Sequence, residues 1–340
     1  MSRREMTPGV SDTRCVIRGM ALDMERVATV FGGSGFIGRY IVKRLAKEGW
    51  VVRVAVRDPG AAHFLKPLGN VGQIVPMPVR IQDRESVEWA VKGADAVFNL
   101  VGILYESGRG QRFEDVQHTG AGQIAQVAAE VGVKGLVHIS AIGADETSES
   151  SYARTKALGE KAVRQAFPDA TILRPSIVVG PEDGFFNRFA AMARVSPALP
   201  LIGGGKTRFQ PVYVGDVADA AMAAVHETAA KGQTYELGGP RVYTFKQLME
   251  LMLKVIRRKR LLLPIPFEVA DMQARIAQLL PKPPLTRDQV KLLKNDNVVA
   301  SDAKTFADLG ITPQAIEVIL PRYLDRYRVG GRFARAAGAV

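Results

Sequence analysis

The chain contains 340 residues, of which 47% are hydrophobic and 24% are charged, and its formal net charge is +12. This length suits one large domain with a smaller second region, and the composition excludes a largely disordered protein. The single cysteine, Cys15, excludes an intramolecular disulfide, and no apolar run approaches the ~20 residues of a transmembrane helix. The positive charge attracts anions such as phosphates, acidic lipid headgroups and acidic protein surfaces. The alternative is that the basic residues form a solvated surface that binds no partner.

Residues 1–25 mix arginines with acidic residues and lack the apolar core of a secretory signal, so we expect a flexible extension there. After it, short apolar runs alternate with segments of helical periodicity, which predicts a parallel sheet with helices on both faces. The predicted strands are Val27–Phe31, Val51–Val56, Gln73–Val79, Asp95–Val101, Gly135–Ser140 and Ala170–Arg174. The predicted helices are Gly35–Glu48, Arg84–Lys92, Phe113–Val131 and Tyr152–Phe167.

After Pro175 the alternation becomes less regular, and prolines and basic residues become frequent. We expect Ser196–Lys206 to be a loop rich in proline and glycine, and Asp216 to lie near a helix N-cap. The predicted strands are Gln210–Val214 and Gln233–Leu237. The predicted helices are Phe185–Val195, Asp216–His226, Phe245–Lys259, Phe267–Leu280, Arg287–Lys294 and Pro313–Tyr327.

A glycine-rich segment joins the first predicted strand to the first predicted helix, with the spacing Gly32-x-x-Gly35-x-x-Gly38. Gly32 permits a tight turn, Gly35 lets the backbone approach a pyrophosphate, and Gly38 allows the helix to sit close to the sheet. The free N–H groups at the helix N-terminus then bind the phosphates. This context predicts a dinucleotide site.

The resulting prediction is an α/β fold, a Rossmann-type doubly wound parallel sheet with a smaller, mostly helical C-terminal region. The nucleotide-binding domain is predicted to cover residues 26–180, and residues 210–239 return to it. Residues 181–209 and 240–327 are expected to form a smaller substrate or docking region. Residues 328–340 are expected to be a flexible basic tail.

The end of the second strand indicates which dinucleotide is bound. An acidic residue there would bind the ribose 2′-hydroxyl of NAD, but this position holds Arg57. A guanidinium can pair with a 2′-phosphate, which favours NADP(H), and Arg39 and Arg80 add positive charge. Asp58 is adjacent and leaves binding of a ribose hydroxyl open.

A tyrosine and a lysine follow the fifth strand at Tyr152 and Lys156, four residues apart and therefore on one helix face. A nearby ammonium favours the phenolate, so Tyr152 is expected to act as an acid or base near neutral pH. Lys156 is also a candidate to hydrogen-bond the nicotinamide ribose.

These motifs together resemble the extended short-chain dehydrogenase/reductase superfamily, over most of residues 27–240. The matching segments are Gly32–Gly38, Asn99–Gly102, Tyr152 with Lys156, Leu173–Pro175 and Val214–Ala218. The segments Val30–Tyr40, Tyr152–Glu160 and Phe167–Pro175 resemble one atypical branch, the NADPH-binding accessory subunits of respiratory complex I (NADH:ubiquinone oxidoreductase) and their bacterial relatives.

This resemblance implies a tightly held, mainly structural NADPH and contact with complex I core subunits. It also implies a peripheral position at the membrane, at the cytoplasmic face of a bacterial inner membrane, or at the matrix face if the protein is mitochondrial. The residues expected to bind the cofactor are Gly32, Ser34, Gly35, Phe36, Ile37, Gly38, Arg39, Arg57, Arg80, Ile81, Val101, Gly102, Ser140, Tyr152, Lys156 and Pro175. We assign no metal site.

The chain departs from the superfamily where active members carry a serine or threonine just after the fifth strand. That position falls on Ala141 or Ile142, whose side chains cannot hydrogen-bond. The alternative is that Ser140, one or two residues before this position, serves as the catalytic serine. Relatives also often carry aspartate or asparagine at the position of Arg80, and threonine at that of Phe31. Two interpretations of Tyr152 and Lys156 follow: they are catalytic residues, or they are the vestiges of a catalytic pair.

The basic run Arg257–Arg260 precedes the apolar run Leu261–Pro266 and an amphipathic segment. Such a segment lies at a membrane surface, in a protein groove, or against its own domain. We expect no nucleic acid partner, because no recognition-helix motif accompanies the basic run. Two hypotheses follow: an NADP(H)-binding accessory subunit of complex I, or an active NADP(H)-dependent reductase or epimerase acting on a nucleotide-sugar or quinone-pathway intermediate.

Overall fold

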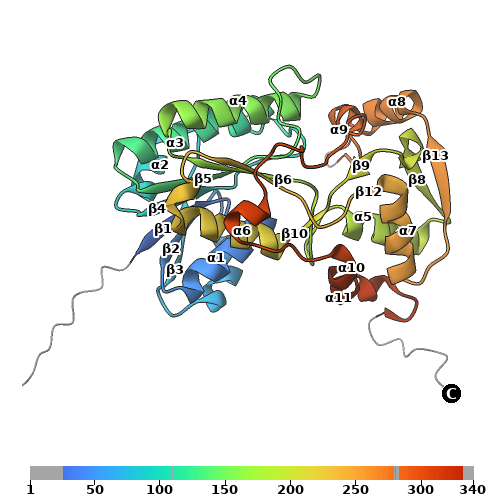
Figure 1. Ribbon diagram of the computed structural model, residues 1–340, viewed down its shortest axis with the longest axis horizontal. Helices are drawn as coiled ribbons and strands as arrows, with labels where there is room; N and C mark the ends of the chain where they lie inside the picture. The colour runs from blue at the N-terminus through green and yellow to red at the C-terminus, as the bar shows by residue number, and fades with distance from the viewer. Residues whose placement is uncertain (1–25, 109, 279, 281–282, 332–340) are drawn as a thin grey trace, which may run out of the picture.

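In the computed structural model, residues 26–108, 110–278, 280 and 283–331 are described, and a seven-stranded sheet lies at the centre (Figure 1). All neighbouring strands are parallel, in the order β3-β2-β1-β4-β5-β6-β11. Strand order reverses between β1 and β4, the switch point at which such sheets bind ligands. The strands are β1 (Val27–Phe31), β2 (Val51–Val56), β3 (Ile74–Pro78), β4 (Ala96–Asn99), β5 (Gly135–Ile139), β6 (Thr171–Pro175) and β11 (Thr234–Leu237).

Helices cover both faces of this sheet, as the strand–helix alternation predicted (Figure 1). One face carries α1 (Phe36–Lys47) and α6 (Val214–His226), and the other carries α2 (Arg84–Val91), α3 (Gly120–Glu130) and α4 (Ser151–Ala166). A π-helix, η2 (Glu114–Thr119), leads into α3, and a 3-10 helix, η1 (Gly60–Leu68), follows β2. Buried apolar side chains pack on each face of the sheet. The strands are therefore mostly apolar on both faces, as is typical of a parallel sheet enclosed by helices. The predicted Rossmann-type α/β fold is confirmed.

A second apolar core lies beyond the carboxyl ends of these strands, and it contains Phe185, Phe186, Phe189, Phe209 and Phe245 in mutual ring contact. Its helices are α5 (Phe186–Val195), α7 (Phe245–Val255), α10 (Ile316–Ile319) and α11 (Pro321–Leu324), and a smaller separate core lies between α8 (Phe267–Ala277) and α9 (Arg287–Leu292). Two short 3-10 helices, η3 (Gly203–Gly205) and η6 (Asp325–Tyr327), belong to this region, whereas η4 (Thr228–Ala230) and η5 (Phe306–Leu309) pack on the sheet face that carries α6. The short strands of the region are β7 (Val178–Val179), β8 (Ala198–Ile202), β9 (Arg208–Phe209), β10 (Val212–Tyr213), β12 (Tyr243–Thr244) and β13 (Leu261–Ile265).

The prediction that Ser196–Lys206 is a loop was wrong. Strand β8 occupies Ala198–Ile202 and pairs in parallel with β13, with Ala198 opposite Leu261 and Ile202 opposite Ile265. Prolines at 197, 200 and 264 suggested a loop, but each strand of a two-stranded ribbon has a free edge at which proline needs no hydrogen-bond partner.

The predicted helix ends and capping also need correction. The helix predicted for Phe245–Lys259 ends at Val255, because Arg257 adopts a left-handed backbone conformation with φ of 53°. Asp216 lies in the first turn of α6, close to the N-cap Tyr213 as predicted, but it does not cap the helix, because its carboxylate accepts hydrogen bonds from the backbone and side-chain amides of Gln314. The carboxylate thus ties α6 to a segment near the C-terminus.

The expectations for residues 1–25, including Cys15, and for 332–340 concern parts of the chain outside the described residues. Within the described residues, none of the helices combines the length and apolar character needed to span a membrane.

Candidate functional site

The glycine loop between β1 and α1 is built so closely that side chains do not fit in it. Gly32 has φ of 76°, and a Cβ on Gly38 would lie 2.4 Å from the Gly32 carbonyl oxygen. A Cβ on Gly33 would lie 2.9 Å from the Val54 side chain. Gly38 therefore lets the helix approach the loop. The close contact with the sheet, which the spacing assigns to Gly38, is made at Gly33.

The N-terminus of α1 presents backbone N–H groups without a competing side chain. Gly35 is the N-cap residue, no side chain caps the helix, and its first turn contains no acidic residue. Ser34, Phe36 and Ile37 lie partly exposed around this turn. An uncapped helix N-terminus built on glycine attracts phosphate, so the loop fits the pyrophosphate of a dinucleotide.

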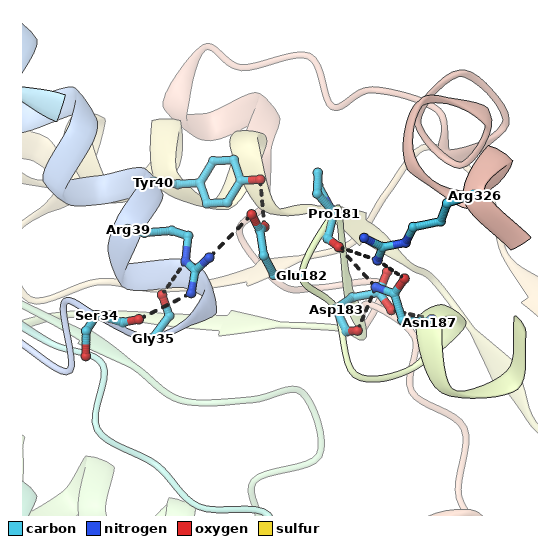
Figure 2. A network of polar contacts seen from close by, with 9 residues as sticks. All are labelled: Ser34, Gly35, Arg39, Tyr40, Pro181, Glu182, Asp183, Asn187 and Arg326. Atoms are coloured by element: carbon cyan, nitrogen blue, oxygen red, sulfur yellow. Dashed lines mark hydrogen bonds and ion pairs between the residues drawn. The ribbon is translucent and has the colours of Figure 1, made fainter. Parts of the chain in front are cut away.

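Arg39 lies over this loop and is part of a polar network shown in Figure 2. Its guanidinium donates to the Gly35 carbonyl at 3.3 Å and the Ser34 carbonyl at 3.4 Å. It also pairs with Glu182 at 3.4 Å and stacks on the Phe64 ring. Glu182 accepts a further hydrogen bond from Tyr40. The network fixes the Arg39 guanidinium beside the loop, with the Glu182 carboxylate as its counter-charge.

Arg57 follows β2 directly, as predicted, and is exposed. It forms no hydrogen bond or ion pair with the described part of the chain, so its guanidinium is free to bind an anion. The neighbouring Asp58 accepts the Ala61 amide at 3.3 Å and so helps to start η1. Beyond β3, Arg80 is exposed and its amide donates to Ser86, while Ile81 is buried against α3. The guanidinium groups of Arg57 and Arg80 thus both lie exposed, without a side-chain partner among the described residues.

The ends of β1, β4 and β5 bring three other predicted residues together. A Cβ on Gly32 would lie 3.5 Å from the Val101 amide nitrogen, and one on Gly102 would lie 3.3 Å from Lys156 Nζ. Lys156 Nζ donates to the Ile139 carbonyl at 3.1 Å. The lysine thus sits where the glycine loop, the β4 end and the β5 end meet.

Ser140 and Pro175 lie at the same edge of the sheet, where the Ser140 amide donates to the Leu173 carbonyl and the Ile142 amide to the Pro175 carbonyl. Ser140 is 4% exposed, and its Oγ has no hydrogen-bond partner among the described residues. A buried hydroxyl without a partner is unfavourable, so this atom fits a polar ligand group.

The surroundings of Tyr152 act on its ionisation in the direction opposite to a nearby ammonium. Burial raises the pKa of Tyr152 to about 12, and the Asp288 carboxylate contributes to this rise. Burial lowers the pKa of Lys156 to about 8, partly offset by Glu160. The ring edge of Phe113 packs against the Tyr152 ring, with centroids 5.9 Å apart. Burial and Asp288 therefore favour the neutral phenol, whereas the Tyr-Lys spacing predicts stabilisation of the phenolate.

His138 is a fully buried neighbour of this site. Burial and the charge of Lys156 lower the pKa of His138 to about 3, so the imidazole is neutral. Its Nδ1 lies 3.2 Å from Asn99 Nδ2, and Asn99 Oδ1 accepts the Val101 amide at 3.1 Å. Asn99 and His138 thereby fix the end of β4 against β5.

Three contributors to the site were missed in the sequence: Phe113, Glu182 and Asp288. Each contacts a predicted residue, namely Tyr152, Arg39 and the first turn of α4, respectively. They come from segments 39 to 143 positions away in the chain, and no local motif marks them.

The parallel sheet, its switch point and the uncapped glycine loop define a Rossmann-type dinucleotide-binding protein. The family model "NAD dependent epimerase/dehydratase family" matches residues 28–238. The chain has a TM-score of 0.69 and 19% identity to a dTDP-glucose 4,6-dehydratase from Streptomyces venezuelae solved with NAD, covering 88% of this chain and 96% of that one.

Relatives similar in sequence indicate to which branch of this class the chain belongs. The chain is 40% identical to the mitochondrial NADH dehydrogenase (ubiquinone) 1 alpha subcomplex subunit 9 of Arabidopsis thaliana, covering 90% of this chain and 79% of the relative. It is 34% identical to the mitochondrial NADH-ubiquinone oxidoreductase 40 kDa subunit of Neurospora crassa, covering 88% and 79%. It is 30% identical to the ceramide reductase of Caulobacter vibrioides, covering 73% and 76%. The chain belongs to the NAD dependent epimerase/dehydratase family and, within it, to the family of these complex I subunits.

Proposed function

We propose that this chain is an NADP(H)-binding accessory subunit of respiratory complex I and that it holds its cofactor as a structural group. One observation carries the proposal: a glycine-built, uncapped helix N-terminus lies beside free Arg57, in a chain that resembles complex I subunits over most of its length.

The residues present fit such a cofactor. The amides of the Gly32–Gly38 loop would bind the pyrophosphate, and Arg57 would bind the 2′-phosphate, with Arg39 and Arg80 adding positive charge. Ser140 Oγ and Lys156 Nζ would hold the nicotinamide end. NADPH supplies a hydride when it is bound, and a substrate must be polarised to accept it.

The residues around Tyr152 support a structural role. Ala141 and Ile142 leave no hydroxyl where active relatives place one. A carbonyl substrate would therefore lack one of the two donors that polarise it.

An active reductase is the second candidate, because the chain keeps both Tyr152 and Lys156 and resembles a ceramide reductase. Single-turnover oxidation of bound NADPH, followed by the absorbance of its reduced nicotinamide across a panel of carbonyl lipids and nucleotide-sugars, separates the two. Oxidation that disappears in Tyr152→Phe would establish the reductase.

We place the protein peripherally at the membrane, on the cytoplasmic face in bacteria or on the matrix face in mitochondria. Exposed apolar side chains on β13 and α8 lie next to the basic run 257–260, a combination that favours an anionic membrane surface or the adjoining complex I subunits. These side chains are Leu261, Leu263, Val269, Met272 and Ile276.

The test is isolation of the protein from solubilised native membranes, with the bound nucleotide released and identified by mass spectrometry. NADP(H) in near-equimolar amount and co-purifying complex I are expected. Complex I lacking the chain, or protein carrying NAD(H) alone, would contradict the proposal.

A further inference from the structure

Helix α9 joins the C-terminal region to the first turn of α4 through one carboxylate. Asp288 accepts hydrogen bonds from Ser150 Oγ at 2.7 Å, from the Ser151 amide at 2.7 Å and from the Tyr152 amide at 3.1 Å. These amides belong to the first turn of α4 and have no partner within the helix. A carboxylate at a helix N-terminus is also favoured by the helix dipole.

The segment around α9 contacts the sheet edge at further points. Lys291 Nζ donates to the Glu149 carbonyl at 3.1 Å, and Asn297 Nδ2 donates to the Ile142 carbonyl at 3.2 Å. Thr286 and Gln289 form a capping box that fixes the start of α9. Residues 286–297 are thus tied across the loop between β5 and α4, and this loop borders the nucleotide site.

Helix α9 depends on these contacts for its position. It has six residues, which is too short for a helix to be stable alone, and its own core consists of Val290 against Ala270, Ala274 and Ile202. Helix α4 also carries Tyr152 and Lys156, both within its first two turns. Any change that orders this end of α4 therefore favours the docked position of α9.

We propose that Asp288 is a positioning residue that couples the nucleotide site to the C-terminal region, so that NADPH binding and the docking of α9 on α4 stabilise each other. The inference rests on the proposed binding of NADPH. Coupling of this kind is reciprocal, so loss of the Asp288 contact must weaken nucleotide binding by the same factor by which bound nucleotide stabilises the docked α9.

The test compares Asp288→Asn with Asp271→Asn in the full-length protein. Asp271 pairs with Arg287 across the exposed α8–α9 contact, so its substitution removes the same charge without removing a bond to α4. Calorimetry gives the Kd for NADPH, and hydrogen exchange with mass spectrometry follows residues 286–297 with and without NADPH. In the wild type and Asp271→Asn, NADPH should slow exchange in this segment. In Asp288→Asn, the slowing should disappear and Kd should rise about 5-fold or more.

A nuclear magnetic resonance signature separates positioning from general stability. The Ser151 and Tyr152 amide protons, which are bonded to a carboxylate, should resonate downfield in the wild type and in Asp271→Asn, and this displacement should be lost in Asp288→Asn. If Asp288→Asn does not fold, Ser150→Ala, which removes one of the three contacts with Asp288 together with the N-cap bond from the Ala153 amide, should raise Kd about 2-fold or more.

Wild-type Kd and wild-type protection of residues 286–297 in Asp288→Asn, or an unchanged Kd in Ser150→Ala, would overturn the coupling and leave the proposed function standing. Wild-type protein that does not bind NADPH would overturn both.

Discussion

Substitution of Gly38 by alanine tests the nucleotide cradle directly. The added Cβ would meet the Gly32 carbonyl oxygen at 2.4 Å and the Gly33 Cα at 2.6 Å, where ordinary contacts begin at 3.4 Å. The loop must therefore retreat by about 1 Å, and these are backbone atoms that cannot rotate away. Overpacking of this kind costs about 1–3 kcal/mol of folding stability. Loss of two charge-assisted bonds to the pyrophosphate removes about 3 kcal/mol of binding, which raises Kd ~100-fold.

The assay is calorimetric titration of nucleotide-stripped protein with NADPH, alongside thermal unfolding. Gly135→Ala is the matched control, because a Cβ there meets nothing within 4 Å and its φ is not in the left-handed region. It should bind NADPH as the wild type does. If folded Gly38→Ala binds NADPH within about 3-fold of the wild type, the loop does not hold a pyrophosphate and the reasoning from the glycine spacing fails.

Three further outcomes are expected. Arg57→Ala should weaken NADPH binding about 10-fold, as loss of one charge-assisted bond implies, and leave NADH binding unchanged; equal losses for both, measured by calorimetry, would exclude contact with the 2′-phosphate. Because the pKa of Tyr152 is raised to about 12 in the fold, its neutral form contributes stability that is complete below pH 10 and is lost as the pH rises towards 12. In Tyr152→Phe, the free energy of unfolding measured by denaturant titration should therefore fall less steeply with pH over this range. The same dependence on pH in Tyr152→Phe and in the wild type would contradict the prediction. Substitution of both exposed residues Met272 and Ile276 by aspartate should leave thermal unfolding unchanged. It should reduce sedimentation of the protein with anionic vesicles several-fold relative to Val242→Asp, a control at another exposed position. Sedimentation equal to that of the control would place the membrane contact elsewhere.

Local sequence patterns were sufficient for the central sheet and for the glycine loop. Strands enclosed by helices on both faces are continuous apolar runs, and the spacing of Gly32, Gly35 and Gly38 is a property of adjacent residues. The ribbon of β8 and β13 could not be predicted, because each strand is proline-interrupted and finds its partner about 60 residues away.

Local sequence patterns also do not predict the protonation and charge partners of the site residues. The Tyr152–Lys156 spacing suggests a lowered tyrosine pKa, but burial and Asp288, which lies 136 positions further along, act to raise the pKa of Tyr152. Likewise, the role of Glu182 beside Arg39 depends on where a distant loop returns to the sheet. Spacing identified the groups present, whereas their protonation depends on tertiary neighbours.

The last strand of the sheet has a consequence for biosynthesis. Strand β11 completes the sheet beside β6, yet about 60 residues that include α5 and β8 separate the two in the chain. A growing polypeptide that has left the ribosome as far as Pro175 therefore exposes an unpaired strand edge until Leu237 has emerged. During this interval the β6 edge is open to pairing with other chains, and a chaperone that shields this edge would act then.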